Sequence, residues 1–370
     1  MDSQKLVDAI KKIRAKMPTI GELAEKSFIK RGELDKFYLF PKARLHLDEW
    51  IGYCTLFNVN KAKDVEYVRK IRYADGDENL YLNVCRPQNR TAGQKLPVFV
   101  YIHGGGWVSG RPEDREAFVS RIASAGFFTV NVFYGYSPEY PHPLPVANIY
   151  RALKWLRTQI DFPEADTDEI WLGGESAGAH LAAIAGAASA NPEYRELLAL
   201  DEEYGEIKFK GLVLNCGVYD IETALESGFK YISSYVYAYY GRPLEEMEED
   251  VYAITMSPVY FVTGAFPKTF LVTAQNDPLK GCGALMRDKL SECGVAFEHF
   301  HGDGAAAVHA FAVSQAFDIS KEAMNRILRF MGKEEQYIVE GTPEYEIEIA
   351  EGSVQSITGA AETPQDGDSV

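Results

Sequence analysis

Residues 169–190 read EIWLGGESAGAHLAAIAGAASA, and this stretch predicts the centre of the fold. A short apolar run ends at Leu172, the segment Gly174–Gly178 has the pattern GxSxG, and an alanine-rich run typical of a buried helix follows directly. A strand, a sharp turn around a serine and a helix together form a nucleophile elbow, in which flanking glycines remove side chains that would collide. The Ser176 hydroxyl then lies beside a helix N-terminus, whose dipole favours negative charge. The alternative interpretation is an ordinary serine that caps the helix.

Strand-like and helix-like segments alternate on both sides of this stretch, from about residue 70 onward. Apolar strands that alternate with amphipathic helices indicate an α/β fold with a mostly parallel sheet covered by helices on both faces. The sequence contains no internal repeat, no GxGxxG fingerprint and no phosphate-binding loop. The predicted strands are 79–85, 97–102, 127–133, 169–172, 211–215, 269–273 and 296–300, and the predicted helices are 113–125, 146–160, 177–190, 281–293 and 320–330.

A second chemical motif, His103-Gly104-Gly105-Gly106-Trp107, follows the predicted strand 97–102. Three successive glycines let backbone N–H groups approach a substrate oxygen without an intervening side chain, which is what stabilisation of a tetrahedral oxyanion requires. We expect the N–H groups of Gly105, Gly106 and Ala177 to form this oxyanion hole. A merely flexible turn is the alternative, and His103 is interpreted as a residue that orders the loop, not as a base.

Two further residues complete a candidate triad in the order serine, aspartate, histidine. Asp277 follows the strand 269–273, and His309 lies in the loop after the strand 296–300. The carboxyl ends of parallel strands meet at one edge of the sheet, so both residues can converge there on Ser176. His309 would accept the serine proton, and Asp277 would hold the imidazole. The other histidines and aspartates fit less well. His299 and His301 lie in or at the end of a predicted strand, and His180 points away on the elbow helix. Asp288 and Asp303 follow no strand in the right order.

These motifs resemble those of the hormone-sensitive-lipase-like branch of the α/β-hydrolase fold, the bacterial carboxylesterases that carry HGGG. The similarity covers about residues 75–332 and rests on HGGGW at 103–107, GESAG at 174–178, DPL at 277–279 and HAF at 309–311. The segment 134–143 is similar to the family's YRLAPE region. The chain departs from the family pattern at Gly135 in this segment, where arginine is usual, and at Asn148 after it, where aspartate is usual. Neither departure removes an atom of the triad.

The resemblance implies a catalytic α/β-hydrolase domain with a cap. We expect residues 1–70 to form an N-terminal helical cap segment and residues 71–333 to form the catalytic domain. The tyrosine-rich segment 219–260 interrupts the α/β pattern and is interpreted as a cap insertion. Residues 334–370 hold ten acidic and no basic residues, and we expect an acidic hairpin followed by a disordered tail.

The resemblance also implies a serine carboxylic-ester hydrolase that works through an acyl-enzyme intermediate without a cofactor or metal. We expect short-acyl or small aryl or acetyl esters as substrates. Trp107, Glu175, Tyr235 and Tyr239 are expected to line the pocket, with a structural rather than chemical role for Glu175. Two alternatives stay open: an amidase, formamidase or peptidase with the same triad, and a non-catalytic ligand-binding member of the fold.

The composition supports a globular protein and excludes several partners. The chain has 370 residues, 46% hydrophobic and 25% charged, with a formal net charge of −16 that repels phosphate backbones and anionic lipids. We therefore expect neither nucleic acid nor a membrane as partner. The five cysteines are scattered without metal-ligand spacing, and the first residues match neither a signal peptide nor a membrane span, which favours the cytoplasm. The predicted C-terminal hairpin either covers a sheet edge or pairs two subunits, so a homodimer stays open.

Overall fold

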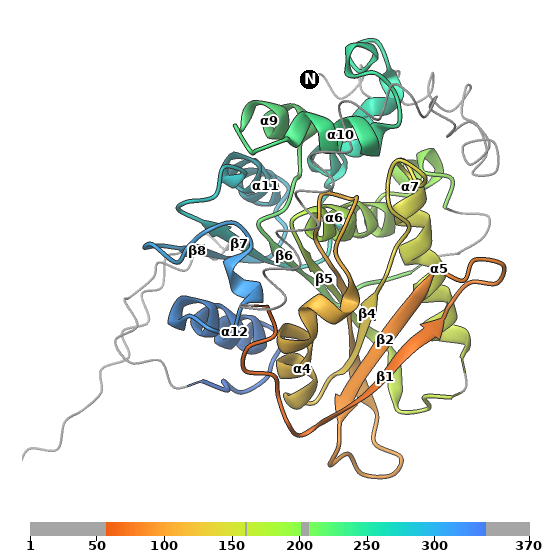
Figure 1. Cartoon of the computed structure of the whole chain (residues 1–370), viewed down its shortest axis with the longest axis vertical. Helices are drawn as coiled ribbons and strands as arrows, with labels where there is room; N and C mark the ends of the chain where they lie inside the picture. The colour runs from red at the N-terminus through yellow and green to blue at the C-terminus, as the bar shows by residue number, and fades with distance from the viewer. Residues whose placement is uncertain (1–56, 160, 201–206, 338–370) are drawn as a thin grey trace, which may run out of the picture.

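An eight-stranded sheet forms the centre of the molecule (Figure 1). The computed structural model describes residues 57–159, 161–200 and 207–337. The strand order is β1-β2-β4-β3-β5-β6-β7-β8; β3 to β8 run parallel to one another, whereas β2 is antiparallel to both β1 and β4. The predicted fold class, an α/β-hydrolase fold with a mostly parallel sheet, is confirmed. The strands are β1 Val65–Arg72, β2 Tyr81–Pro87, β3 Leu96–Ile102, β4 Phe128–Val132, β5 Ala165–Glu175, β6 Gly211–Asn215, β7 Thr269–Ala274 and β8 Phe297–Gly302.

Helices cover both faces of the sheet, as Figure 1 shows. Helices α4 and α12 pack on one face, and α5, α6 and α11 pack on the other. The α-helices are α4 Glu116–Ser124, α5 Leu144–Thr158, α6 Ala177–Ala190, α7 Pro192–Leu197, α9 Ile221–Glu226, α10 Ile232–Tyr240, α11 Lys280–Glu292 and α12 Asp318–Phe330. The 3-10 helices are η2 Pro112–Arg115, η3 Leu244–Glu246, η4 Val251–Met256, η5 Pro258–Phe261 and η6 Phe311–Val313.

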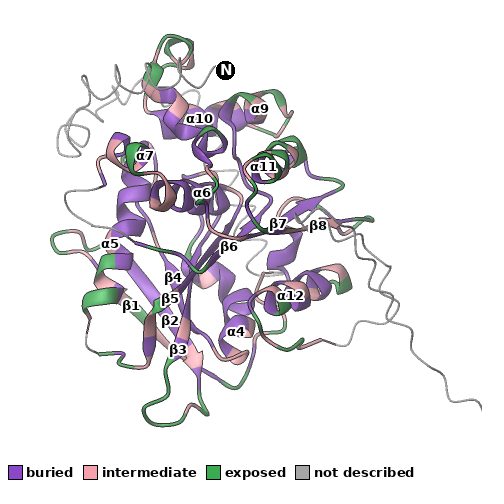
Figure 2. Ribbon diagram, turned by 180° about the vertical axis from the view of Figure 1, so that it is seen from behind, coloured by how far each residue is buried: buried purple, intermediate pink, exposed green. Residues whose placement is uncertain are grey.

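The side chains of β3 show why both faces of the sheet are apolar. Val98 and Val100 belong to the core on the α5 and α6 side, whereas Phe99 and Tyr101 belong to the core under α4 and α12. Successive residues of a strand point to opposite faces, so a strand covered on both sides needs a nearly continuous apolar sequence. Figure 2 shows the result as a buried sheet between helices whose outer surfaces are exposed.

The first described strand corrects one prediction. The expectation that residues 1–70 are helical is wrong for residues 65–70, which belong to β1 (Val65–Arg72) and pair antiparallel with β2. Charged residues between apolar ones at irregular spacing conceal the strand, and its register shifts between Val68 and Ile71. Lys70 at this bulge has φ 59°, and its N–H donates to the Asn83 side chain at 2.8 Å. Residues 58–64 of the predicted N-terminal cap form turns, bends and irregular backbone, and residues 1–56 lie outside the described residues.

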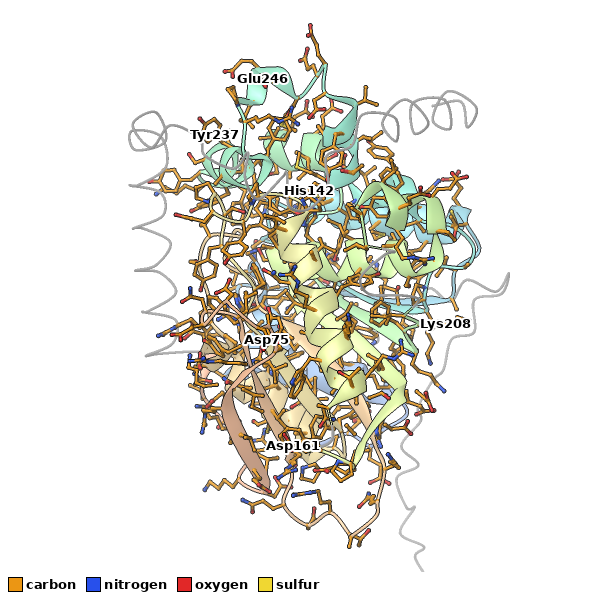
Figure 3. The ribbon with its side chains drawn as sticks, turned by 90° about the vertical axis from the view of Figure 1, so that its right-hand side faces the viewer. Asp75, His142, Asp161, Lys208, Tyr237 and Glu246 are labelled. Atoms are coloured by element: carbon orange, nitrogen blue, oxygen red, sulfur yellow. The ribbon has the colours of Figure 1, made fainter. Side chains whose placement is uncertain are left out.

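The segment between β6 and β7, for which the sequence predicts a cap insertion, is largely helical. It contains α9, α10 and the three 3-10 helices η3 to η5, and it lies beyond the carboxyl ends of the strands. Figure 3 shows Tyr237 and Glu246 of this insertion at one end of the molecule and Asp161 at the other. The insertion therefore covers the edge of the sheet at which the predicted triad converges.

The chain after α12 runs back along the domain surface. Asn325 of α12 accepts the N–H groups of Gln336 and Tyr337 at 3.1 and 3.0 Å, and the Gln336 side chain donates to the Arg121 carbonyl. The predicted acidic hairpin beyond this point, like the rest of residues 338–370, lies outside the described residues. None of the helices in the described part of the chain combines the length and apolar character that a membrane crossing needs.

Candidate active site

Ser176 lies in the sharp turn between β5 and α6. Its backbone has φ 55° and ψ −122°, a conformation that costs a residue with a side chain about 1–3 kcal/mol and is kept only where surrounding contacts impose it. Ser176 N–H donates to the Asn215 carbonyl at 2.9 Å, and the side chain makes no capping hydrogen bond to α6. The elbow geometry is therefore present, and the alternative of a capping serine is wrong.

The glycines of the GxSxG motif are required by close backbone contacts. A Cβ atom on Gly178 would lie 2.0 Å from the Ile102 carbonyl oxygen, and one on Gly174 would lie 2.5 Å from the Gly178 carbonyl carbon. Real Cβ atoms do not approach backbone atoms so closely, so α6 can reach the end of β3 only with glycine at these positions. This contact also places the first turn of α6 against the HGGG loop.

Asp277 and His309 form a hydrogen-bonded pair next to this turn. His309 Nδ1 lies 3.0 Å from Asp277 Oδ2, and Asp277 Oδ1 accepts the Leu279 N–H at 2.9 Å. The two loops that carry the pair are joined by a bridge between Asn276 and Val308. Burial opposes the ionisation of Asp277, but the charge and hydrogen bond of His309, the Leu279 N–H and the Cys216 thiol together lower the pKa of Asp277. Asp277 is thus held as a buried anion that orients the imidazole.

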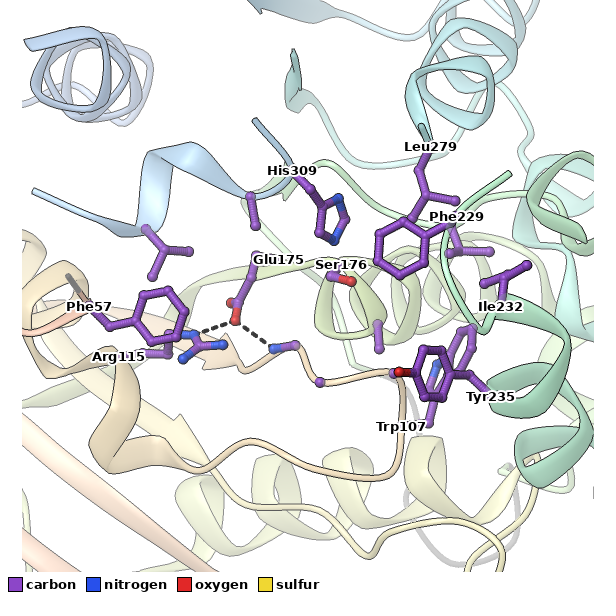
Figure 4. A pocket seen from close by; sticks show the side chains of 17 residues that line it. Phe57, Trp107, Arg115, Glu175, Ser176, Phe229, Ile232, Tyr235, Leu279 and His309 are labelled. Carbon is purple, nitrogen blue, oxygen red and sulfur yellow. Dashed lines mark hydrogen bonds and ion pairs between the residues drawn. The ribbon is translucent and has the colours of Figure 1, made fainter. Parts of the chain in front are cut away.

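The structure brings His309 and Ser176 to the same pocket. Figure 4 shows the imidazole beside the Ser176 hydroxyl, and both residues line the cavity. Since Nδ1 of His309 is engaged by Asp277, Nε2 is the nitrogen available to a serine proton. The Phe229 ring of the cap insertion packs edge-on against the imidazole, with ring centroids 5.0 Å apart.

The HGGG loop presents free backbone donors to the same cavity. Gly105 has φ 122° and Gly106 has φ 57°, and the Gly105 carbonyl accepts the N–H groups of Val108 and Ser109, which closes a tight turn. A Cβ on Gly105 would lie 2.2 Å from the Ser109 carbonyl oxygen. Among the described residues, the N–H groups of Gly105, Gly106 and Ala177 have no hydrogen-bond acceptor. All three residues line the cavity together with Ser176, as an oxyanion hole requires.

The cavity around Ser176 is small and mostly apolar. Its volume is about 140 Å³. Of the four predicted pocket residues, Trp107, Glu175 and Tyr235 line it. The prediction for Tyr239 is wrong, because this ring stacks behind Trp107 at 4.6 Å and is fully buried there. The other residues that line the cavity were not predicted as pocket residues from the sequence: Phe57, Arg115, Val218, Phe229, Ile232, Leu279, Ala310 and Val313.

Two buried histidines support Trp107 from behind. His180 Nδ1 accepts the Trp107 indole N–H at 3.0 Å, and His180 Nε2–H donates to the Met256 carbonyl at 2.7 Å. His142 lies between the Tyr239 hydroxyl and the Thr255 hydroxyl, at 2.9 Å from each. These bonds connect the HGGG loop to the cap insertion. His180 therefore points away from Ser176, as predicted.

His180 should make the protein sensitive to acid. Burial lowers the pKa of His180 to about 4, whereas an unfolded histidine titrates near 6.5. Between these values the unfolded chain binds a proton that the folded chain excludes, so stability falls as pH falls from about 6.5 to about 4. At pH 5 this linkage amounts to about 2 kcal/mol for His180 alone. Urea unfolding at pH 7.5 and pH 5.0 should show a loss that is about 2 kcal/mol smaller in His180→Gln than in the wild type. Equal losses in the two proteins would contradict this expectation.

The other histidines considered as bases have structural positions. His103 is fully buried against the Tyr134 ring, its Nδ1 donates to the Gly104 carbonyl at 2.8 Å, and burial lowers its pKa to about 3. His299 and His301 lie in β8, and both contact the Thr273 hydroxyl at 2.8 Å. None of the three lines the cavity, so His309 is the histidine in position to act on Ser176.

Among the described residues, one cluster at the site has donor atoms that lie close enough together to bind a metal ion. Ligand atoms of Cys216, Asp277 and His309 lie within 4.8 Å of one another. Two of these residues are already bonded to each other, and Cys216 is buried behind them with its pKa raised by burial and by the Asp277 charge. We therefore interpret these three residues as a hydrogen-bonded Asp–His pair with a buried thiol behind it, and not as a metal centre.

A serine in a strained strand-to-helix turn, a buried Asp–His pair and unpaired loop N–H groups at the carboxyl edge of a parallel sheet define an α/β hydrolase. A family model for the alpha/beta hydrolase fold matches residues 99–313. The chain belongs to this family, which confirms the family indicated by the sequence motifs.

The curated relatives and solved structures agree with that assignment. The chain is 26% identical over 257 residues to Esterase LipQ of Mycobacterium tuberculosis, covering 66% of this chain and 60% of the relative. It is also 26% identical over 209 residues to Carboxylesterase NlhH of the same species, covering 55% of this chain and 63% of the relative. The chain thus spans about 60% of the length of these relatives. Esterase B of Lactobacillus rhamnosis superposes with a TM-score of 0.68 at 22% identity over 78% of this chain and 91% of its own, which shows a shared fold.

Proposed function

We propose that this protein is a serine carboxylic-ester hydrolase with Ser176 as nucleophile, His309 as general base and Asp277 as the residue that orients His309. The observation that carries the proposal is the convergence of three parts on one cavity. These are the elbow serine, the Asp277–His309 pair at 3.0 Å and the unpaired N–H groups of the HGGG loop. Relatives named as esterases support the same reaction class.

The proposed reaction has two halves. His309 Nε2 accepts the Ser176 proton while Oγ attacks the ester carbonyl carbon, and the N–H groups of Gly105, Gly106 and Ala177 stabilise the oxyanion. The imidazolium then protonates the departing alkoxide, which leaves an acyl group on Ser176. Water, deprotonated by His309, attacks this acyl-enzyme, and collapse of the second tetrahedral intermediate releases the acid and restores the serine.

The cavity supports small substrates. A volume of about 140 Å³ is close to that of an engineered apolar cavity that accommodates benzene, roughly 150 Å³. Its walls include the side chains of Trp107, Phe229, Ile232 and Tyr235, which favour an apolar group of limited length. Short-acyl esters and small aryl or acetyl esters fit these dimensions, whereas long acyl chains would need the walls to move.

The two alternative functions receive less support. A non-catalytic ligand-binding protein would not need a serine, a histidine and an aspartate arranged in this order. It would also not need unpaired N–H groups beside the serine. An amidase would use the same triad. Apart from the triad hydroxyl and imidazole, the polar side chains that line the cavity are those of Arg115, Glu175 and Tyr235. None of the other lining residues has a polar side chain that could recognise an amide N–H. Ester hydrolysis needs no such recognition.

The test is a series of p-nitrophenyl esters from acetate to palmitate, with p-nitroacetanilide as the matched amide. We expect turnover that is greatest for acetate to butyrate and falls steeply for longer chains. An initial burst of p-nitrophenol should precede the steady state wherever deacylation is slower than acylation. Hydrolysis of the anilide faster than of the acetate ester would favour the amidase, and folded protein without turnover of any substrate would contradict the proposal.

A further inference from the structure

A buried ion pair lies in the wall of the cavity and has no part in the triad. Arg115 Nε donates to Glu175 Oε1 at 2.5 Å, and the two side chains are only 3% and 1% exposed. Arg115 comes from η2, 60 residues before Glu175 in the sequence. Figure 4 shows the pair beside Ser176, on the opposite side from Tyr235 and Ile232, with Phe57 next to the guanidinium. The guanidinium carbon lies 4.4 Å from the Phe57 ring centroid, a cation–π contact.

The Glu175 carboxylate connects the two halves of the catalytic machinery. Its Oε1 also accepts the Gly104 N–H at 2.6 Å, and its Oε2 accepts the Tyr101 hydroxyl. Glu175 directly precedes the nucleophile Ser176, and Gly104 directly precedes the oxyanion donor Gly105. The carboxylate thus bonds the HGGG loop to the residue that directly precedes Ser176.

The fit around this carboxylate is tight. A Cβ on Gly104 would lie 2.8 Å from the Glu175 carbonyl oxygen and 3.1 Å from Glu175 Oε1. Burial and the neighbouring Glu175 charge raise the pKa of Tyr101 well above its usual value, so Tyr101 stays protonated and serves as a donor to the carboxylate. The HGGG loop thus has little freedom to move relative to Ser176 while the carboxylate is in place.

The charge of Arg115 has a second consequence. A carboxylate beside an oxyanion hole would repel the negative charge that develops on the substrate oxygen in the transition state. The Arg115 cation neutralises it at contact distance. A buried ion pair seldom stabilises a fold more than apolar residues of similar size would, so stability alone does not explain a pair at this position.

We propose that Arg115 and Glu175 are positioning residues: the carboxylate holds the oxyanion loop against the nucleophile elbow, and the guanidinium both orients this carboxylate and cancels its charge. The proposal rests on the proposed serine-esterase function. It assigns to η2, which carries none of the triad or oxyanion residues, a role in transition-state stabilisation. Neither residue contributes atoms to the reaction itself.

The test compares Arg115→Met, Arg115→Lys, Glu175→Gln and the double variant Arg115→Met/Glu175→Gln with the wild type. Arg115→Met should lower kcat for p-nitrophenyl butyrate about 10- to 100-fold with KM changed less than about threefold, since misplacing oxyanion donors costs less than deleting one. The dissociation constant of a boronic acid, which binds serine as a tetrahedral anion, should rise in parallel with the fall in kcat. Arg115→Lys should recover part of the activity because it keeps the charge.

The double variant separates the charge effect from a structural one. Glutamine can still accept the Gly104 N–H but carries no charge, so Arg115→Met/Glu175→Gln should be at least about threefold more active than Arg115→Met. Arg111→Met removes a partly exposed ion pair with Asp114 on the same turn and should keep wild-type kcat and boronate affinity. Melting temperatures identify any variant that fails to fold, and in that case Arg115→Lys and Glu175→Gln still decide the question.

Two outcomes would overturn the proposal. In the first, Arg115→Met folds and keeps wild-type kcat and boronate affinity; in the second, the double variant is no more active than Arg115→Met and the loss follows the melting temperature alone. Failure of the serine-esterase function is recognised separately, because Ser176→Ala would then retain activity. Inactive Ser176→Ala together with an unaffected Arg115→Met would reject only the positioning role.

Discussion

Ser176→Ala is expected to lower kcat for p-nitrophenyl butyrate by about 10⁴-fold or more while the protein stays folded, since removing a triad nucleophile eliminates the acyl-enzyme route. Alanine and serine tolerate φ 55° equally, so the backbone strain of the elbow is the same in both proteins. The deleted Oγ makes no capping hydrogen bond to α6, and its loss leaves no partner in the helix unpaired. The melting temperature should therefore be unchanged or slightly raised.

Mass spectrometry and a matched variant complete this experiment. A phosphonate ester should add one covalent group to the wild type, on the peptide that contains Ser176, and none to Ser176→Ala. Ser189→Ala changes a serine at the other end of α6, whose hydroxyl donates to the Gly186 carbonyl, and should behave as the wild type. Substantial remaining activity in Ser176→Ala would reject the proposed mechanism.

Asp277→Asn should lower kcat by about 10⁴-fold. Asparagine is nearly isosteric with aspartate, but its amide NH₂ is a donor and its oxygen carries no charge. Asparagine can hold His309 in the tautomer that carries the proton on Nε2, and this nitrogen then cannot accept the serine proton. Asparagine also does not stabilise the imidazolium. Stopped-flow measurement of p-nitrophenol release should show that acylation itself is slowed.

A second aspartate provides the control for this variant. Asp303 is exposed in the loop that leads to His309, and its carboxylate lies 3.6 Å from His301. Asp303→Asn should keep wild-type kcat because this carboxylate does not contact His309 or Ser176. Equal losses in Asp277→Asn and Asp303→Asn would contradict the assignment of Asp277 as the acid of the triad.

Several elements were predictable because their determinants lie close together in the sequence. The bounds predicted for α6, 177–190, and for β6, 211–215, agree with the structure at both ends. The elbow follows from glycines within two residues of Ser176, and the order of the proposed triad follows from which loops leave the carboxyl ends of the strands. These features depend on local sterics and on the twofold periodicity of strands, both of which are visible in a short stretch of sequence.

Other features depend on partners that lie far apart in the chain. β1 has a weak pattern of its own and is a strand because β2 offers a free edge and Asn83 bonds the bulge at Lys70. Tyr235 and Tyr239 are four residues apart on α10, yet one lines the cavity and the other stacks behind Trp107. Residues four apart lie on the same helix face, and only the packing against the HGGG loop distinguishes them.

The sequence by itself determined the α/β class and the position of Ser176 in the elbow, and it singled out Asp277 and His309 as the proposed partners of Ser176, because glycine sterics, strand alternation and motif order are encoded within short segments. The tertiary structure alone decided which side chains surround Ser176. Arg115 meets Glu175 across 60 residues, and the Glu175 carboxylate meets the Gly104 N–H across 71. Such contacts arise from the packing of separate elements around one buried charge, and no local pattern in the sequence predicts them.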